Sequence, residues 1–84
     1  MPDHRPIERI AADLRRVRRT RAGFEPGASA AKKIGARQAY DALLVQACAA
    51  LEVEHHLLSL PEGVDREIER FRVEERLRSL GLSL

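Results

Sequence analysis

The twelve residues YDALLVQACAAL, at positions 40–51, decide the fold, because Asp41 and Gln46 are their only polar members. Alanine and leucine are among the strongest helix formers, and this stretch contains no glycine or proline. We therefore predict a central helix from about residue 29 to about residue 58, with Ser29 as its N-cap. A helix that is apolar almost all the way round must be covered on several sides.

A first helix, over residues 6–20, is predicted upstream of this stretch, because apolar residues recur there at alternating spacings of three and four. These residues are Ile7, Ile10, Leu14 and Val17. Residues 1–5 are expected to form a flexible N-terminus. Residues 21–28 contain two glycines and a proline, so we expect them to connect the first and central helices.

The start of the last helix has two candidates. Ser59 is followed three residues later by Glu62, which matches a capping box and places the start at about residue 60. The alternative start is Asp65, which follows Gly63. Gly81 is typical of the residue that follows a helix, so the last helix should end at residue 80. The short connection favours antiparallel packing of the central and last helices.

The last helix carries apolar side chains on two nearly opposite faces. Val64, Ile68 and Phe71 share one face, which we expect to pack on the central helix. Val73, Leu77 and Leu80 share the other face, which then requires the first helix or another subunit.

These patterns predict one all-α domain over residues 1–84, an elongated helical hairpin with an additional basic amphipathic N-terminal helix. A helix of residues 29–58 would be about 45 Å long, whereas a compact globule of this chain length is about 30 Å across. We therefore expect oligomerisation, favouring a dimer, to cover the remaining apolar surface. The predicted self-association residues are Tyr40, Leu43, Leu44, Ala47, Leu51, Val73, Leu77, Leu80, Leu82 and Leu84.

Charge is distributed unevenly along the chain. Residues 1–40 hold ten basic and four acidic residues, a net charge of +6, and residues 41–84 hold five basic and nine acidic residues, a net charge of −4. The basic half could attract nucleic-acid phosphates, an acidic protein or an anionic membrane surface, although a run of charge is ordinarily a solvated face. The candidate anion-binding residues are Arg15, Arg16, Arg18, Arg19, Arg21, Lys32, Lys33 and Arg37.

Candidates for chemistry are few. Glu52 and His55 are three residues apart, which on a helix places a carboxylate and an imidazole on one face, as in metal-binding bundles. Cys48 is about two turns from His55 on the same predicted helix, so no nucleophile and base can be brought together. The four serines lie near predicted helix ends, where capping explains them. We expect no enzymatic activity, no catalytic residues and no cofactor.

The function expected from the sequence is a non-enzymatic interaction module that associates with itself or with another protein. The alternative is a nucleic-acid-binding accessory protein that uses the basic face from Arg15 to Arg21, and a metal-binding helical bundle ranks third. No apolar stretch approaches the length of about 20 residues that spans a bilayer. Because the chain has no signal-like N-terminus and a single cysteine, we expect a cytoplasmic protein.

Overall fold

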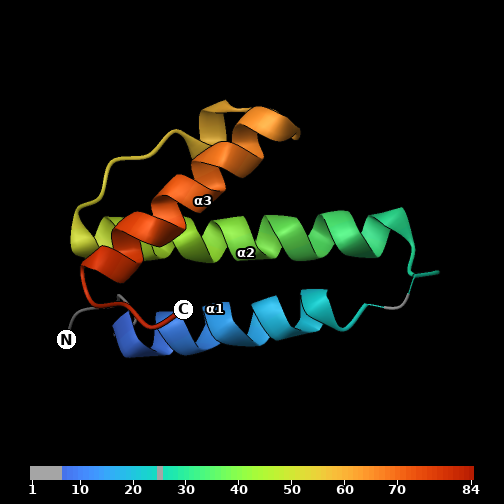
Figure 1. Ribbon diagram of the computed structural model, residues 1–84, viewed down its shortest axis with the longest axis horizontal. Coiled ribbons are helices and arrows are strands. Elements are labelled where there is room, and N and C mark those ends of the chain that lie inside the picture. Colours follow the sequence, from blue (N-terminus) through green and yellow to red (C-terminus); the bar gives the residue numbers. More distant parts are fainter. Residues whose placement is uncertain (1–6, 25) are drawn as a thin grey trace.

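The computed structural model describes residues 7–24 and 26–84, and all regular structure in these ranges is helical. Figure 1 shows three α-helices: α1 (Ile7–Ala22), α2 (Ala30–Leu51) and α3 (Val64–Ser79), with a short 3₁₀ helix, η1 (Leu57–Ser59), before α3. The predicted all-α class with three helices is confirmed. The shape is elongated, 42 × 24 × 23 Å along the principal axes. The predicted flexible residues 1–5 lie outside the described residues.

The hairpin of the fold is formed by α1 and α2, which lie side by side and run in opposite directions (Figure 1). Ser29 caps α2 as predicted, since its hydroxyl accepts a hydrogen bond from the Lys32 amide at 3.2 Å. Residues from all three α-helices and η1 form one apolar core. The core residues are Ile10, Leu14, Tyr40, Leu44, Ala47, Cys48, Leu57, Val73 and Leu77.

Helix α2 ends at Leu51, seven residues before the predicted end at residue 58. Glu52 has a left-handed conformation, with φ of 56°, and its amide donates to the Cys48 carbonyl. Leu51 and Ile7 line the same surface hollow, so α2 ends level with the first described turn of α1. If α2 continued, its added residues would extend past the described part of α1, on which α2 packs. The observed turn instead allows Leu57 to be fully buried in the core.

Helix α3 crosses α2 obliquely, and the two run in roughly the same sense, so the predicted antiparallel packing is wrong (Figure 1). Residues 52–63 return along α2 before α3 begins. The predicted capping box does not form, because the Ser59 hydroxyl donates to the His56 carbonyl at 2.9 Å. Helix α3 instead starts at Val64, after Gly63, one residue before the alternative predicted start.

The C-terminal end of α3 forms a Schellman motif, in which Gly81 follows the helix as predicted. Gly81 has φ of 100°, and its amide donates to the Arg78 carbonyl at 2.9 Å. The Leu82 amide donates to the Leu77 carbonyl at 3.0 Å. The turn directs the C-terminal residues back to α1, where Arg15 donates to the Ser83 carbonyl at 2.6 Å.

The two apolar faces of α3 are used in the opposite way to the prediction. Val73 and Leu77 are fully buried against the rest of the chain. Val64, Ile68 and Phe71, predicted to pack on the central helix, are 70%, 63% and 60% exposed. The rotation of α3 about its own axis therefore differs from the one that apolar periodicity suggested, and polar contacts explain it.

Candidate interaction surfaces

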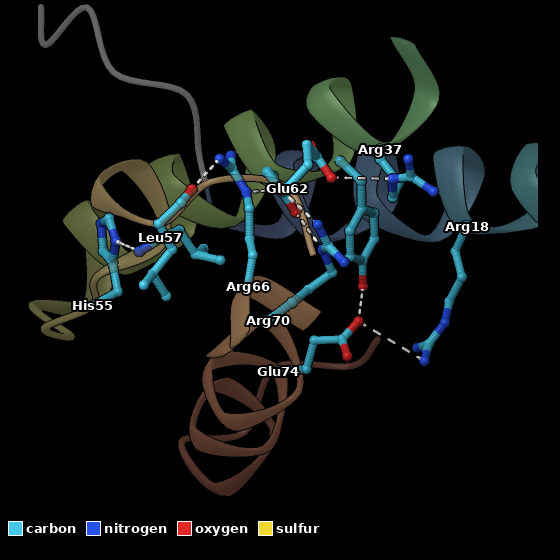
Figure 2. Close-up of polar contacts among 11 residues, drawn as sticks. Arg18, Arg37, His55, Leu57, Glu62, Arg66, Arg70 and Glu74 are labelled. Carbon is cyan, nitrogen blue, oxygen red and sulfur yellow. Dashed lines mark hydrogen bonds and ion pairs between the residues drawn. The ribbon is translucent and has the colours of Figure 1, made fainter. Parts of the chain in front are cut away.

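A buried carboxylate on α2 sets the rotation of α3. Asp41 is 1% exposed and accepts two hydrogen bonds from Arg70, at 2.6 and 2.8 Å, and one from Arg66 at 3.0 Å. Figure 2 shows both arginines reaching from α3 to α2. Burial by itself raises the pKa of Asp41, but the hydrogen bonds and charges of Arg70 and Arg66 outweigh it and hold the pKa below its ordinary value.

The sequence contained a signal for this contact that apolar periodicity alone misses. Arg66, Arg70, Val73 and Leu77 fall at spacings of four, three and four, so they share one face of α3. An acidic residue within an apolar helix requires a partner when it is buried, and two arginines one turn apart can supply it.

A second polar contact joins all three helices. The buried Tyr40 hydroxyl of α2 donates to the Glu74 carboxylate of α3, and a guanidinium nitrogen of Arg18 on α1 lies 3.9 Å from that carboxylate (Figure 2). The guanidinium of Arg21 lies over the Tyr40 ring, 5.4 Å from its centroid. Burial, followed by the interactions with Glu74, raises the pKa of Tyr40.

A third contact fixes residues 52–63 against α3. Glu69 accepts hydrogen bonds from Arg72 at 2.7 and 2.8 Å and from the His56 amide at 2.7 Å. Arg72 also donates to the Glu54 carbonyl at 3.1 Å. The hydrogen bond from Arg72 is the main reason that the pKa of Glu69 falls to about 2, against the opposing effect of burial and with help from the His56 amide.

The result of these contacts is a row of large apolar side chains that faces outward. We call Val64, Ile68 and Phe71 the α3 stripe; each is at least 60% exposed. Leu58 of η1, a further exposed apolar residue, is 68% exposed. At 100° per residue, Asp65 and Arg72 lie along one side of the stripe, Glu67 and Arg78 lie along the other, and the exposed Glu75 falls in line with the stripe itself.

Half of the predicted self-association residues are occupied within the single chain. Tyr40, Leu44, Ala47, Val73 and Leu77 are buried in the core. Leu43, Leu51, Leu82 and Leu84 are partly buried against the core, and Leu80 is exposed. The exposed positions in the middle of α2 carry small or polar residues: Ala42, Gln46, Ala49 and Ala50. Most of the apolar surface of α2 is therefore covered within the single chain. Ile34 near its start is 39% exposed, and the more exposed large apolar side chains belong to α3 and η1.

The predicted basic face is divided among several contacts. Arg15 binds the C-terminal backbone, Arg16 pairs with Asp13 at 3.0 Å, and Arg18 lies near Glu74. Arg19 and Lys32 are exposed. The remaining three cations, Arg21, Lys33 and Arg37, line one pocket at the end of the α1–α2 hairpin.

The metal prediction relied on a helix that the structure does not contain at that position. Glu52 and His55 follow the end of α2, so the three-residue spacing does not place them on one helical face. The His55 Nδ1 atom accepts a hydrogen bond from the Leu57 amide at 3.3 Å. Within residues 7–24 and 26–84, no group of three histidine, cysteine or acidic residues could hold a metal ion. Cys48 is buried in the core, and burial is the main reason that its pKa is raised.

The fold and its surfaces define a small three-helix protein with an exposed apolar stripe and a separate cationic pocket. Comparisons with protein-family models, curated protein sequences and solved structures find no match for this chain. No helix in the described part of the chain is long and apolar enough to cross a membrane.

Proposed function

We propose that this chain is a non-enzymatic helical interaction module that forms a homodimer through the α3 stripe. The observation that carries the proposal is the outward position of Val64, Ile68 and Phe71, on a helix whose opposite face is buried. Three large, adjacent apolar side chains on a protein of this size are typical of a surface that another molecule covers.

The stripe cannot be covered by rotation of α3 within the chain. Such a rotation would separate Asp41 from Arg66 and Arg70 and leave a buried carboxylate without its partners. Removal of one partner from a buried ion pair costs about 3–5 kcal/mol. Rotation would also expose Val73 and Leu77, which are fully buried. A second molecule is therefore the way to remove the stripe from water.

The charges beside the stripe favour a second copy of this chain as that molecule. One side of the stripe carries Asp65 and two arginines, Arg72 and Arg76, and the other side carries Glu67 and Arg78. Arg72 and Arg78 also form ion pairs within their own chain. In an antiparallel two-fold dimer, each side of the stripe faces the equivalent side of the other copy, with the order of residues reversed. This arrangement brings acidic residues towards basic ones on both sides. A partner of uniform charge would meet repulsion on each side.

The expected dimer is weak and reversible. Standard interfaces bury about 800 Å² on each partner, which is about a seventh of the 5682 Å² accessible surface of this chain. Full burial of a valine, isoleucine or phenylalanine contributes about 1.5–3 kcal/mol, whereas association costs at least about 4 kcal/mol in lost freedom. Six partly exposed side chains from two copies therefore support a Kd in about the micromolar range.

Amide NMR spectra at increasing protein concentration test where the chain associates. The proposal predicts shifts at Leu58, Val64, Ile68 and Phe71, with little change along the outer face of α1. Concentration-dependent shifts that occur instead along α1 or α2, or spectra that do not change with concentration, would contradict the proposal.

A further inference from the structure

The pocket at the connected end of the α1–α2 hairpin has an unusual lining. Arg21, Phe24 and Pro26 contribute from the end of α1 and the connector, and Lys33 and Arg37 contribute from the first turns of α2. Its volume is about 290 Å³. The described lining residues include three cations and no acidic residue. Glu25, which lies between Phe24 and Pro26 in the sequence, is outside the described residues.

Two of the three cations have no acidic partner among the described residues. Neither Arg21 nor Lys33 forms an ion pair with an acidic residue in the described part of the chain. Arg37 is already paired: its buried Nε atom lies 3.4 Å from a carboxylate oxygen of Glu62 and has no hydrogen-bond partner besides this ion pair (Figure 2). The pocket therefore holds two cations, Arg21 and Lys33, that no described acidic residue neutralises.

The start of α2 adds to the positive potential. The first turn of α2 contains no acidic residue, although α1 has Glu8 there and α3 has Asp65 and Glu67. Lys33 lies near the end of α2 where the helix dipole is positive, so its charge is unfavourable in the absence of an anion. A bound anion would interact favourably with the dipole and with all three side chains.

We propose that Arg21, Lys33 and Arg37 bind a phosphate group in this pocket. Arginine offers a planar set of donors that matches phosphate oxygens, and lysine adds a compact charge. Half-buried Phe24 supplies a flat apolar wall, on which an aromatic base can stack. The volume accommodates the phosphate and part of the group that carries it, as in a nucleotide. This site is independent of the α3 stripe.

The chain offers a matched pair of lysines for the test. Lys32 and Lys33 are adjacent, exposed and equal in charge, but only Lys33 lines the pocket. Isothermal titration calorimetry at low salt would measure the binding of inorganic phosphate, adenosine monophosphate and a short oligothymidylate to the full chain. Adenosine, which lacks phosphate, serves as the ligand control. Circular dichroism would verify that both variants retain the fold.

The proposal predicts that Lys33→Gln weakens phosphate or adenosine monophosphate binding by about tenfold, the effect of losing one charged hydrogen bond. Lys32→Gln should change the affinity by less than about twofold, because its charge lies outside the pocket. Adenosine should not bind. If adenosine monophosphate competes with the oligonucleotide, both ligands bind the same pocket. The bound phosphate group can then belong to a nucleic acid as well as to a small molecule.

Two results would overturn the assignment of this site. The first is absence of binding by all three phosphate-bearing probes. The second is equal weakening by Lys32→Gln and Lys33→Gln, which would indicate a general attraction to the basic surface. Glu25→Gln removes the acidic residue nearest to the pocket in sequence and should leave binding intact or strengthen it.

Discussion

Arg70 on α3 binds Asp41 on α2 through two parallel hydrogen bonds, from Nε to Oδ1 at 2.6 Å and from Nη2 to Oδ2 at 2.8 Å. Their side chains are 7% and 1% exposed, so solvent does not weaken the pair. Because Arg70 shares a face with Val73 and Leu77, the pair determines which side of α3 enters the core. The α3 stripe on the opposite side is exposed as a consequence.

Substitution Asp41→Asn should lower the free energy of unfolding by about 3 kcal/mol, because it leaves Arg66 and Arg70 without their buried counter-charge. Urea unfolding followed by circular dichroism measures the change. The matched control is Glu75→Gln, which removes an exposed carboxylate paired with Arg78 at 3.0 Å and should cost less than about 1 kcal/mol. Equal effects of the two variants would contradict the role assigned to Asp41.

Stability should decrease in acid because the pKa values of Asp41 and Glu69 are lower in the folded chain than in the unfolded chain. For Glu69, the contribution is complete above the ordinary value of 4.5 and is lost as the pH falls towards about 2. The midpoints of urea unfolding, determined at several pH values within this range, measure the loss of stability. Glu69→Gln should reduce the dependence on pH in this window; an unchanged slope would exclude Glu69 as a contributor.

The assignment of the two faces of α3 predicts opposite sensitivities to truncation. Leu77→Ala should destabilise the chain by about 2–5 kcal/mol, because it creates a cavity in the core. Phe71→Ala should change the free energy of unfolding by at most about 0.5 kcal/mol in dilute solution, where the chain is monomeric. A larger loss for Phe71→Ala than for Leu77→Ala would show that α3 packs with its other face inward.

Two glycines should respond to alanine in opposite directions. Gly35 lies in α2 with no atom within 4 Å of the position of an added Cβ, so Gly35→Ala should stabilise the chain by about 0.5–1 kcal/mol. Gly81 has φ of 100° in the Schellman motif, so Gly81→Ala should destabilise it by about 1 kcal/mol. Thermal unfolding of both variants shows whether each substitution stabilises or destabilises the chain. Stabilisation by Gly81→Ala would contradict the observed turn.

The features that the sequence predicted correctly depend on local chemistry. Ser29 caps α2 and Gly81 ends α3, because each signal involves backbone groups within a few residues. The end of α2 was not predicted, because it depends on where α1 begins and on the burial of Leu57. No local signal in residues 52–58 carries that information.

The candidate site was predicted less well, for a related reason. Apolar periodicity gave α3 two possible inner faces, and only the contact of Asp41 with two arginines chooses between them. Of the eight candidate anion-binding residues, Arg21, Lys33 and Arg37 line one pocket, because the connector is too short to separate the ends of α1 and α2.

Sedimentation equilibrium over concentrations from about 10 μM to about 1 mM tests the central proposal, the homodimer through the α3 stripe, most directly. The account predicts a mass that rises from 9.5 kDa towards twice that value for the unsubstituted chain and for the control Gln38→Glu, an exposed position on α2. Ile68→Glu should remain at 9.5 kDa throughout. A mass of 9.5 kDa for the unsubstituted chain at every concentration, or equal dimerisation by Ile68→Glu, would contradict it.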